Sequence, residues 1–304
     1  MNQQLSSTIP PIPRVIVDPF KCFNNLLMYK PEIKGNNIFI PGDSYQKYDS
    51  ICDFFTEEIR LKTKRFDEKY SPSDYWKKNY LQIIQTSKKT GLTLDEILYQ
   101  ACKGQVNFKI TGILGLLEIA SRLINKQLSK CTIFDPSAGN GGIIFAGMAK
   151  SCKHIIANDP NSDLIDPYQR IQTFFSTIKK ESNIHFTHQS FSSNYSYPEA
   201  VPNPDIIFTS PPFFNIEKYS SETTQSIEMY PNFNHWLDLF LKPYLTHCIQ
   251  LLNLNGILLL HYVDFPQARA TSTILKHLEQ YFVKTIFLKS TKRCYSTPVY
   301  IFKK

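Results

Sequence analysis

The sequence has little of what metal centres, disulfide frameworks and membrane spans require. Its seven cysteines are scattered, and no two of them form a C-x-x-C pair. This spacing argues against a zinc site and a disulfide framework, and it is typical of reduced thiols. No apolar run approaches the roughly 18 residues of a membrane span. The amino terminus has no charged segment followed by an apolar one, so we expect no signal peptide. The sequence therefore favours the cytoplasm or another reducing intracellular compartment, with no metal and no membrane association.

Internal repeats and low-complexity tracts are also absent. A length of 304 residues with a 42% hydrophobic fraction suits one large domain with an appendage. Residues 1–20 are proline-rich and predict an extended arm, and 45–103 show apolar residues at helical spacing. We therefore interpret 1–104 as an extended arm with a small helical appendage, and 105–304 as the main domain.

The charge is positive and unevenly placed. The chain carries 34 basic and 26 acidic residues, a net charge of +8. Between 276 and 304 there are seven lysines and arginines (276, 284, 289, 292, 293, 303 and 304) against one acid, Glu279. A basic cluster beside a site favours a polyanionic partner, although a solvated face is the plainer interpretation.

Short apolar segments alternate with helical ones from about residue 105 onward. The strand candidates are 131–135, 154–159, 183–189, 205–210, 256–263, 284–290 and 298–304. Helical patterns cover 111–128 before the first candidate and 164–180, 234–253 and 270–282 between later ones. This alternation predicts an α/β fold: a Rossmann-like, doubly wound, mostly parallel sheet of seven strands. Only a short link joins the last two candidates, so they predict an antiparallel strand at the sheet edge.

A glycine-rich loop, FDPSAGNGG, follows the first strand candidate of the main domain and opens a helix. Glycines there allow a tight turn and the close approach of a ligand to the backbone. Asp135 leads the loop and no lysine follows the glycines, so this is not a phosphate-binding P-loop. An acid at that position suits a cationic ammonium group, although a plain glycine turn is an alternative.

Asp159 ends the next strand candidate, 24 residues beyond Asp135. A carboxylate at this place can accept hydrogen bonds from ribose hydroxyls. An Asp before a proline can also be a turn or cap residue.

The stretch TSPPFF, residues 209–214, follows the apolar run DIIF. Two prolines fix two φ angles and remove two backbone donors, so the strand must stop there. The Ser210 hydroxyl and the Pro211 carbonyl can both accept hydrogen bonds, and Phe213 offers a flat face for stacking. This set suits a planar ring that bears an exocyclic amine. A surface turn is the alternative.

Together, these motifs in this order resemble those of the class I S-adenosylmethionine-dependent amino-methyltransferases, which carry D-P-x-x-G-x-G and [DNS]-P-P-[YFW]. That family includes DNA N6-adenine and N4-cytosine enzymes, RNA adenine enzymes and a protein-glutamine branch. The resemblance covers roughly residues 105–304. It implies S-adenosyl-L-methionine as the cofactor and an exocyclic base amine as the methyl acceptor.

Carried over by position, the resemblance implies the following roles. The methionine end of the cofactor would lie against Asp135, Pro136, Gly139 and Gly141, and its ribose against Asp159. An adenine contact that the family usually makes with an acid would fall to Gln189 or Ser190, and Phe108 would line the pocket or pack in the core. The target amine would lie at Ser210, Pro211, Pro212 and Phe213.

The resemblance leaves the acceptor open between adenine and cytosine, because a serine before the prolines favours N4-cytosine and the motif order favours N6-adenine. We expect nucleic acid as the partner, with DNA ahead of RNA. A protein amide, or a non-catalytic subunit that binds nucleic acid or another protein, is the alternative. The chain has little room for a target-recognition domain, so recognition would fall to residues 1–104, the basic tail, a protein partner or residues 215–236. Those last residues predict a mobile loop.

Overall fold

The computed structural model describes residues 18–178, 182–192, 194–292 and 296–304. The expected extended arm lies outside these residues up to position 17, and so do Arg293 and Cys294. The end of that predicted arm is already helical: Asp18 caps helix α1 (Pro19–Met28) by accepting the Lys21 N–H at 3.0 Å.

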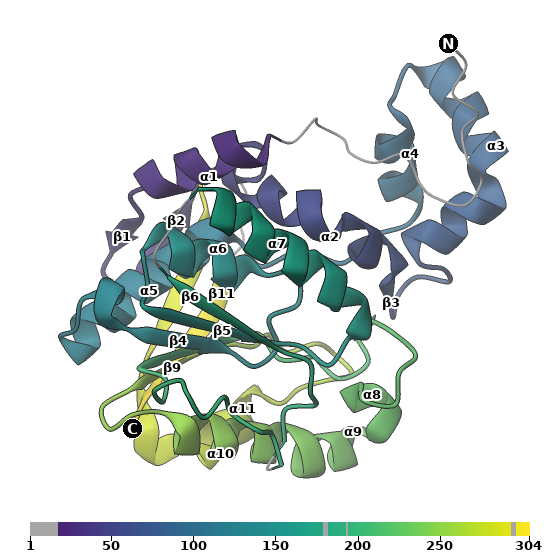
Figure 1. Ribbon diagram of the computed structural model, residues 1–304. Coiled ribbons are helices and arrows are strands. Elements are labelled where there is room, and N and C mark those ends of the chain that lie inside the picture. The colour runs from purple at the N-terminus through teal and green to yellow at the C-terminus, as the bar shows by residue number, and fades with distance from the viewer. Residues whose placement is uncertain (1–17, 179–181, 193, 293–295) are drawn as a thin grey trace.

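The described residues form a nine-stranded sheet between two layers of helices (Figure 1). In spatial order its strands are β1 (Glu32–Lys34), β2 (Asn37–Ile40), β10 (Phe282–Ser290), β11 (Ser296–Lys303), β9 (Ile257–His261), β7 (Ile206–Thr209), β4 (Thr132–Asp135), β5 (His154–Asn158) and β6 (Asn183–Thr187). All seven strand candidates are confirmed. Strands β6, β5, β4, β7 and β9 are mutually parallel, so the protein has the predicted Rossmann-like, doubly wound fold.

The antiparallel strand of the carboxyl-terminal pair is not at the sheet edge, where the sequence placed it. Strand β11 lies between β9 and β10 and is antiparallel to both. The crossover from β9 to β10 leaves one strand position free, and the chain returns from β10 into that gap. The edge is formed instead by β1 and β2, which come from the amino-terminal segment, and β2 pairs in parallel with β10. The alternation of strands and helices in the sequence could not predict this edge, because the β1–β2 hairpin is short and lies far along the chain from β10.

Helices cover both faces of the sheet, and each face has its own apolar core. One layer contains α1, α2 (Ser50–Lys62), α5 (Ile110–Ile124), α6 (Gly142–Ala149) and α7 (Ile165–Thr177). The other contains α10 (Lys242–Leu251) and α11 (Thr271–His277), preceded by the short helices α8 (Ser226–Met229) and α9 (Phe233–His235) and π-helical residues Trp236–Leu241. Strands β4 and β7 are buried along their whole length, which explains why their central residues are consecutive apolar side chains rather than alternating apolar and polar ones.

The remaining helices, α3 (Pro72–Thr90) and α4 (Leu94–Ala101), form a hairpin that projects from the body, at the upper right of Figure 1. Ser71 caps α3, and Thr93 with Glu96 forms a capping box at the start of α4, as the local sequence suggested. A small cluster of Trp76, Ile83, Ile97 and Leu98 holds the two helices together. The helical appendage therefore exists, but the β1–β2 hairpin of the same segment belongs to the main sheet.

Candidate active site

A cavity of about 520 Å³ opens at the carboxyl ends of β4, β5, β7 and β9. This is the edge at which open α/β sheets bind ligands. The residues proposed from the sequence that line it are Phe108, Asp135, Pro136, Gly139, Asp159, Ser190, Ser210, Pro212 and Phe213. Three others, Gly141, Gln189 and Pro211, are not among its lining residues. Both motifs therefore meet in one cavity, although they are more than 70 residues apart in the chain.

The glycine loop is shaped by backbone bonds and two positive φ angles. Gly139 has a φ of 48° and Gly141 a φ of 80°. The loop closes on itself through Gly141 N–H to the Ala138 carbonyl at 2.9 Å. A Cβ on Gly141 would lie 3.2 Å from Ile144 Cδ1, whereas Gly139 faces open space. Gly141 therefore shapes the start of α6, and Gly139 is the glycine that borders the cavity.

Asp135 ends β4 and is 3% exposed. Its Oδ1 accepts the Ser137 N–H at 3.0 Å. Burial raises the pKa of this carboxyl well above its ordinary value, and the neighbouring Asp159 adds to the rise. A buried carboxyl group without a cationic partner beside a cavity favours a positively charged ligand, which would stabilise its ionised form.

Asp159 follows β5 and holds the glycine loop. Its Oδ2 accepts the Gly139 N–H and its Oδ1 accepts the Asn161 N–H, both at 3.0 Å. Burial raises the pKa of Asp159 to about 6, although both backbone bonds act in the opposite direction. Each carboxylate oxygen can accept a further hydrogen bond. The side chain can therefore shape the loop and bind a hydroxyl group at the same time.

The two residues proposed after β6 differ in their surroundings. Gln189 exchanges hydrogen bonds with Asn158 through its backbone, and its Oε1 accepts the Ser196 N–H at 3.2 Å. Ser190 lines the cavity and donates to the Thr224 carbonyl at 3.0 Å. Gln189 thus fastens a loop, and Ser190 connects the cavity wall to the segment after TSPPFF.

The TSPPFF turn leaves β7 and packs against the end of β9. The Phe213 ring meets Tyr262 edge-on, with ring centroids 5.0 Å apart. Phe214 has a φ of 56°, unusual for a bulky residue, and is buried against Phe233 and Trp236. Prolines and surrounding packing thus hold this turn in one geometry.

The histidine His261 was missed by the sequence analysis. It is the last residue of β9, and its Nδ1 lies 2.8 Å from Ser210 Oγ. It also lines the cavity. The available signal was a polar residue at the carboxyl end of an otherwise apolar strand, GILLLHYV.

The segment after the turn is ordered over the cavity. Its strand β8 (Glu217–Lys218) pairs with β3 (Lys64–Arg65), which follows α2. Arg65 and Glu217 both line the cavity. The amino-terminal segment and the segment after TSPPFF therefore form part of the cavity wall together.

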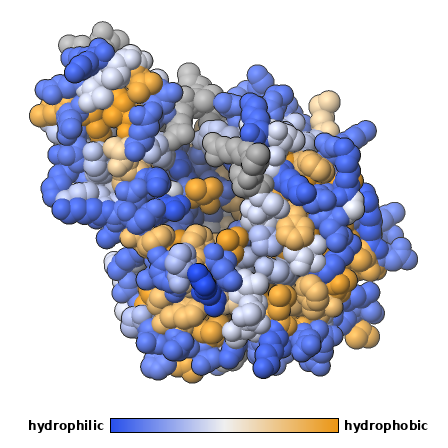
Figure 2. Space-filling model, turned by 180° about the vertical axis from the view of Figure 1, so that it is seen from behind, coloured by the Kyte–Doolittle hydropathy of each residue, from blue (hydrophilic) through white to orange (hydrophobic). Residues whose placement is uncertain are grey.

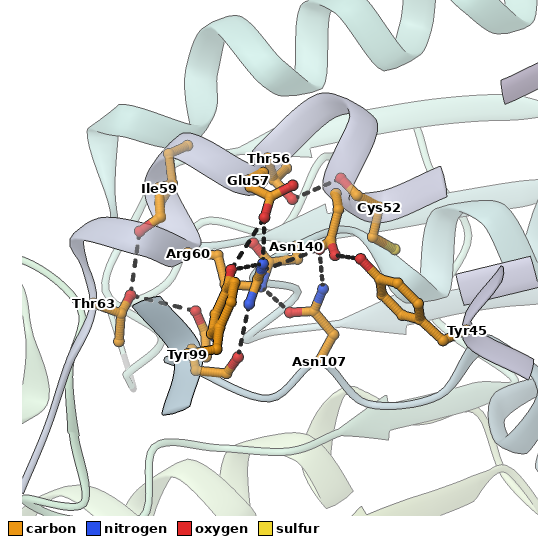
Figure 3. A network of polar contacts seen from close by, with 12 residues as sticks. Tyr45, Cys52, Thr56, Glu57, Ile59, Arg60, Thr63, Tyr99, Asn107 and Asn140 are labelled. Atoms are coloured by element: carbon orange, nitrogen blue, oxygen red, sulfur yellow. Dashed lines mark hydrogen bonds and ion pairs between the residues drawn. The ribbon is translucent and has the colours of Figure 1, made fainter. Parts of the chain in front are cut away.

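A buried polar network joins the amino-terminal helices to the glycine loop (Figure 3). Arg60 of α2 lies 3.2 Å from Asp53 and 2.5 Å from Glu57, and Tyr99 of α4 donates to Glu57 at 3.1 Å. The network reaches the loop through Asn107.

Asn107 is the link between the network and the glycine loop. Its Nδ2 donates to Asp53 Oδ1 at 2.8 Å, and its Oδ1 accepts from Asn140 Nδ2 at 2.5 Å. Asn107 and Asn140 line the cavity. The spacing of these residues in the sequence does not predict the network, because its members come from segments far apart in the chain.

Part of the basic tail lies away from the cavity. Lys303 pairs with Ile257 at the amino end of β9, and Lys304 Nζ donates to the carbonyls of Gln250 and Leu252 at 2.7 Å. Lys304 thus stabilises the end of α10, whereas Lys303 Nζ donates to the Leu123 carbonyl near the end of α5 at 3.4 Å, and neither lysine lines the cavity.

Within the described residues, no group of three or more His, Cys, Asp or Glu side chains could hold a metal ion. No helix in these ranges has the length and apolar character needed to cross a membrane. The six cysteines in the described ranges are buried free thiols.

No protein-family model and no curated protein matches the sequence. Solved structures with a similar fold include TrmN from Thermus thermophilus, at a TM-score of 0.42 and 13% identity over 65% of this chain and 49% of that one. Magnesium protoporphyrin IX methyltransferase from Synechocystis, solved with bound SAM, gives 0.40 and 13% over 74% and 97%. An rRNA methylase from Streptococcus thermophilus gives 0.40 and 11% over 66% and 98%. These values describe a similarity of fold and carry no information on substrate.

Proposed function

We propose that this protein is an S-adenosylmethionine-dependent N-methyltransferase that acts on an exocyclic amine of a base in nucleic acid. The observation that best supports this proposal is that two groups of residues line one cavity: Asp135, Gly139 and Asp159 in one group, and Ser210, Pro212 and Phe213 in the other. A volume of about 520 Å³ lies within the range of small-ligand and cofactor sites. It can therefore hold a cofactor and one flipped base at its mouth.

The cofactor half of the cavity suits S-adenosyl-L-methionine, which supplies an electrophilic methyl group on a positively charged sulfur. Asp135 is the buried carboxyl group that a cationic ligand would stabilise, and Gly139 lets the backbone approach it. Asp159 would accept ribose hydroxyls, and Ser190 and Phe108 would border the adenine and methionine portions. Gly141 and Gln189 act indirectly in this proposal, by shaping the loops.

The acceptor half suits an amine on an aromatic ring. Such a nitrogen is a weak nucleophile because its lone pair is delocalised into the ring. Hydrogen bonds from its protons to Ser210 Oγ draw it toward a tetrahedral geometry and expose the lone pair. Pro211 is buried and outside the cavity lining, so Ser210 is the better supported acceptor. Pro212 and Phe213 would hold the ring plane.

Nucleic acid is the proposed partner because a basic helix stands beside the cavity. Thr63 and Arg65 line the cavity before the α3–α4 hairpin, and Gln105 and Val106 line it after the hairpin. The hairpin is thus rooted at the cavity rim, and Figure 2 shows it from behind as a lobe at the upper left with a hollow beneath it. Its longer helix, α3, carries four exposed lysines: Lys77, Lys78, Lys88 and Lys89.

We place DNA ahead of RNA as the substrate. RNA is the alternative acceptor, because single-stranded RNA presents its bases without the cost of base flipping that a target in duplex DNA carries. The proposal leaves adenine and cytosine as the two candidate bases.

The test is incubation of the purified protein with tritium-labelled S-adenosylmethionine and duplex DNA, single-stranded DNA, RNA or total protein. We expect label in nucleic acid, and nucleoside mass analysis then identifies N6-methyladenine or N4-methylcytosine. Asp135→Ala serves as the inactive control. Label confined to protein would replace the proposal with the amide alternative, and cofactor binding without label in any acceptor would favour a non-catalytic subunit.

A further inference from the structure

Ser210 and His261 occupy equivalent places on neighbouring parallel strands. Thr209 is in register with Leu260, so the next residues, Ser210 and His261, lie side by side at the same edge of the sheet. Their side chains meet there, with Ser210 Oγ 2.8 Å from His261 Nδ1. The Ser210 hydroxyl therefore has a fixed partner before any substrate binds.

The surroundings of His261 keep its ring neutral and leave one nitrogen unused. The rings of Phe108 and Phe213 lie edge-on to the imidazole, with centroids 4.9 and 5.5 Å away. Burial lowers the pKa of His261 to about 4. Its Nε2 is buried and has no hydrogen-bond partner among the residues that the structure describes. A buried polar atom without a partner is costly, so such an atom beside a cavity is a candidate ligand contact.

A neutral imidazole has one N–H donor and one acceptor nitrogen. If the Ser210 O–H donates to Nδ1, both lone pairs of Oγ remain free to accept the N–H groups of a target amine. Nε2 then carries the proton and is a free donor. In the opposite tautomer Nδ1–H would occupy a lone pair of Oγ, and the serine proton would need another acceptor.

We propose that His261 is a positioning residue whose Nδ1 fixes the Ser210 hydroxyl as an acceptor and whose Nε2–H donates to the target ring. This inference rests on the proposed function. The pair would recognise an amine attached beside a ring nitrogen acceptor, an arrangement that adenine and cytosine share. His261 adds no covalent step; it sets which hydrogen-bonding pattern the cavity accepts.

The activity test uses three variants. His261→Phe removes both nitrogens, and His261→Asn offers a carboxamide oxygen that can replace the Nδ1 acceptor. We expect His261→Phe to lower kcat for methyl transfer roughly tenfold to hundredfold, with an unchanged Kd for the cofactor. His261→Asn should recover part of the loss. Because the two side chains act as a unit, Ser210→Ala combined with His261→Phe should lose little more than Ser210→Ala alone. Full additivity, or an unchanged kcat in His261→Phe, overturns the proposal.

A second measurement is independent of activity. Nitrogen NMR of the histidine-labelled wild-type protein should show His261 as the Nε2–H tautomer, with Nδ1 unprotonated. Ser210→Ala should shift the Nδ1 signal. A wild-type Nδ1–H tautomer overturns the inference even if the enzyme is active. The expected tautomer in a protein that methylates no acceptor supports the Ser210–His261 arrangement and rejects the proposed function instead.

Discussion

The carboxyl edge of the sheet and the α3–α4 hairpin differ in how their residues are held and in how far they project from the body. At the sheet edge, the polar groups of Asp135, Asp159 and Ser210 are held by short bonds to neighbouring loops and strands. The hairpin has a core of four buried hydrophobic residues and projects from the body. Chemistry needs groups fixed in place, whereas contact with a long polyanion needs reach and charge.

The two regions are nevertheless connected. The buried Arg60 network takes members from α2, α4 and the glycine loop, so the root of the hairpin and the glycine loop share hydrogen bonds (Figure 3). The comparison predicts that variants at the sheet edge alter cofactor binding, that variants on the hairpin surface alter polyanion binding, and that variants in the network alter both regions.

The largest expected effect is at the sheet edge. Asp135→Ala removes the only carboxylate that leads the glycine loop, so cofactor affinity should fall at least about a hundredfold, as for the loss of a buried charged partner. Calorimetric titration with S-adenosylmethionine measures it. Asp166→Ala, at a largely exposed carboxylate of α7, is the matched control and should bind normally. An unchanged Kd for Asp135→Ala would remove the glycine loop from the cofactor site.

The next largest expected effect is a loss of stability when the buried Arg60 network is disrupted. The side chains of Asp53 and Glu57 are 2% and 6% exposed, so Arg60→Met leaves two buried carboxylates without their cation. We expect the free energy of unfolding to fall by about 3–5 kcal/mol in urea titration. Arg122→Met, which removes an exposed arginine of α5, should cost no more than about 0.5 kcal/mol. Equal costs would mean that the network does not hold the two regions together.

A smaller effect is expected on the hairpin surface. Lys77, Lys78, Lys88 and Lys89 of α3 are exposed. The two pairs lie three helical turns apart on one face, roughly 16 Å along the axis. In α3 as described, none of the four forms an ion pair with an acid. Lys78 Nζ donates to the Tyr70 hydroxyl at 2.8 Å, but no acid among the described residues neutralises any of the four charges, so all four can attract phosphates.

Reversing these four charges to glutamate should weaken duplex DNA binding and lower the slope of log K against log salt by as much as about 3.6. Fluorescence anisotropy at several salt concentrations measures both, and cofactor affinity should not change. The control reverses four exposed lysines elsewhere, Lys21, Lys30, Lys130 and Lys153. If the control loses as much affinity, binding follows net charge and the hairpin has no special role.

The smallest expected effect is the change of cofactor affinity with pH. The pKa of Asp159 is about 6 in the folded protein and lower when unfolded, so folding holds its proton more tightly. The stability that this group contributes therefore falls as pH rises toward 6. Ribose hydroxyls bind the ionised form, so cofactor affinity should rise roughly tenfold between pH 5 and pH 7. Asp135 would act in the same direction, and Asp159→Asn separates the two. A flat profile in the wild type would exclude the ribose role.

Local sequence was sufficient for seven of the described strands, β4 to β7 and β9 to β11, for most helices and for the two motifs. Runs such as CTIFD and GILLLHYV are apolar because both faces of their strands are covered, and Ser71 and Thr93 cap helices through bonds to residues three positions away. The parallel order of the sheet then requires residues after successive strands to meet at one edge. This is why Asp135, Asp159 and Ser210 could be assigned to one site before the structure was described.

Tertiary structure alone decided the rest. The insertion of β11 between β9 and β10, the β1–β2 extension and the pairing of β3 with β8 are contacts between distant segments, which no local period encodes. The Ser210–His261 bond depends on the register of β7 against β9, and the Arg60 network depends on how α2 packs beside the glycine loop. Sequence determines which groups are available through local backbone preferences and apolar patterning. Packing determines which polar atoms meet, because a buried polar atom must find its partner in three dimensions.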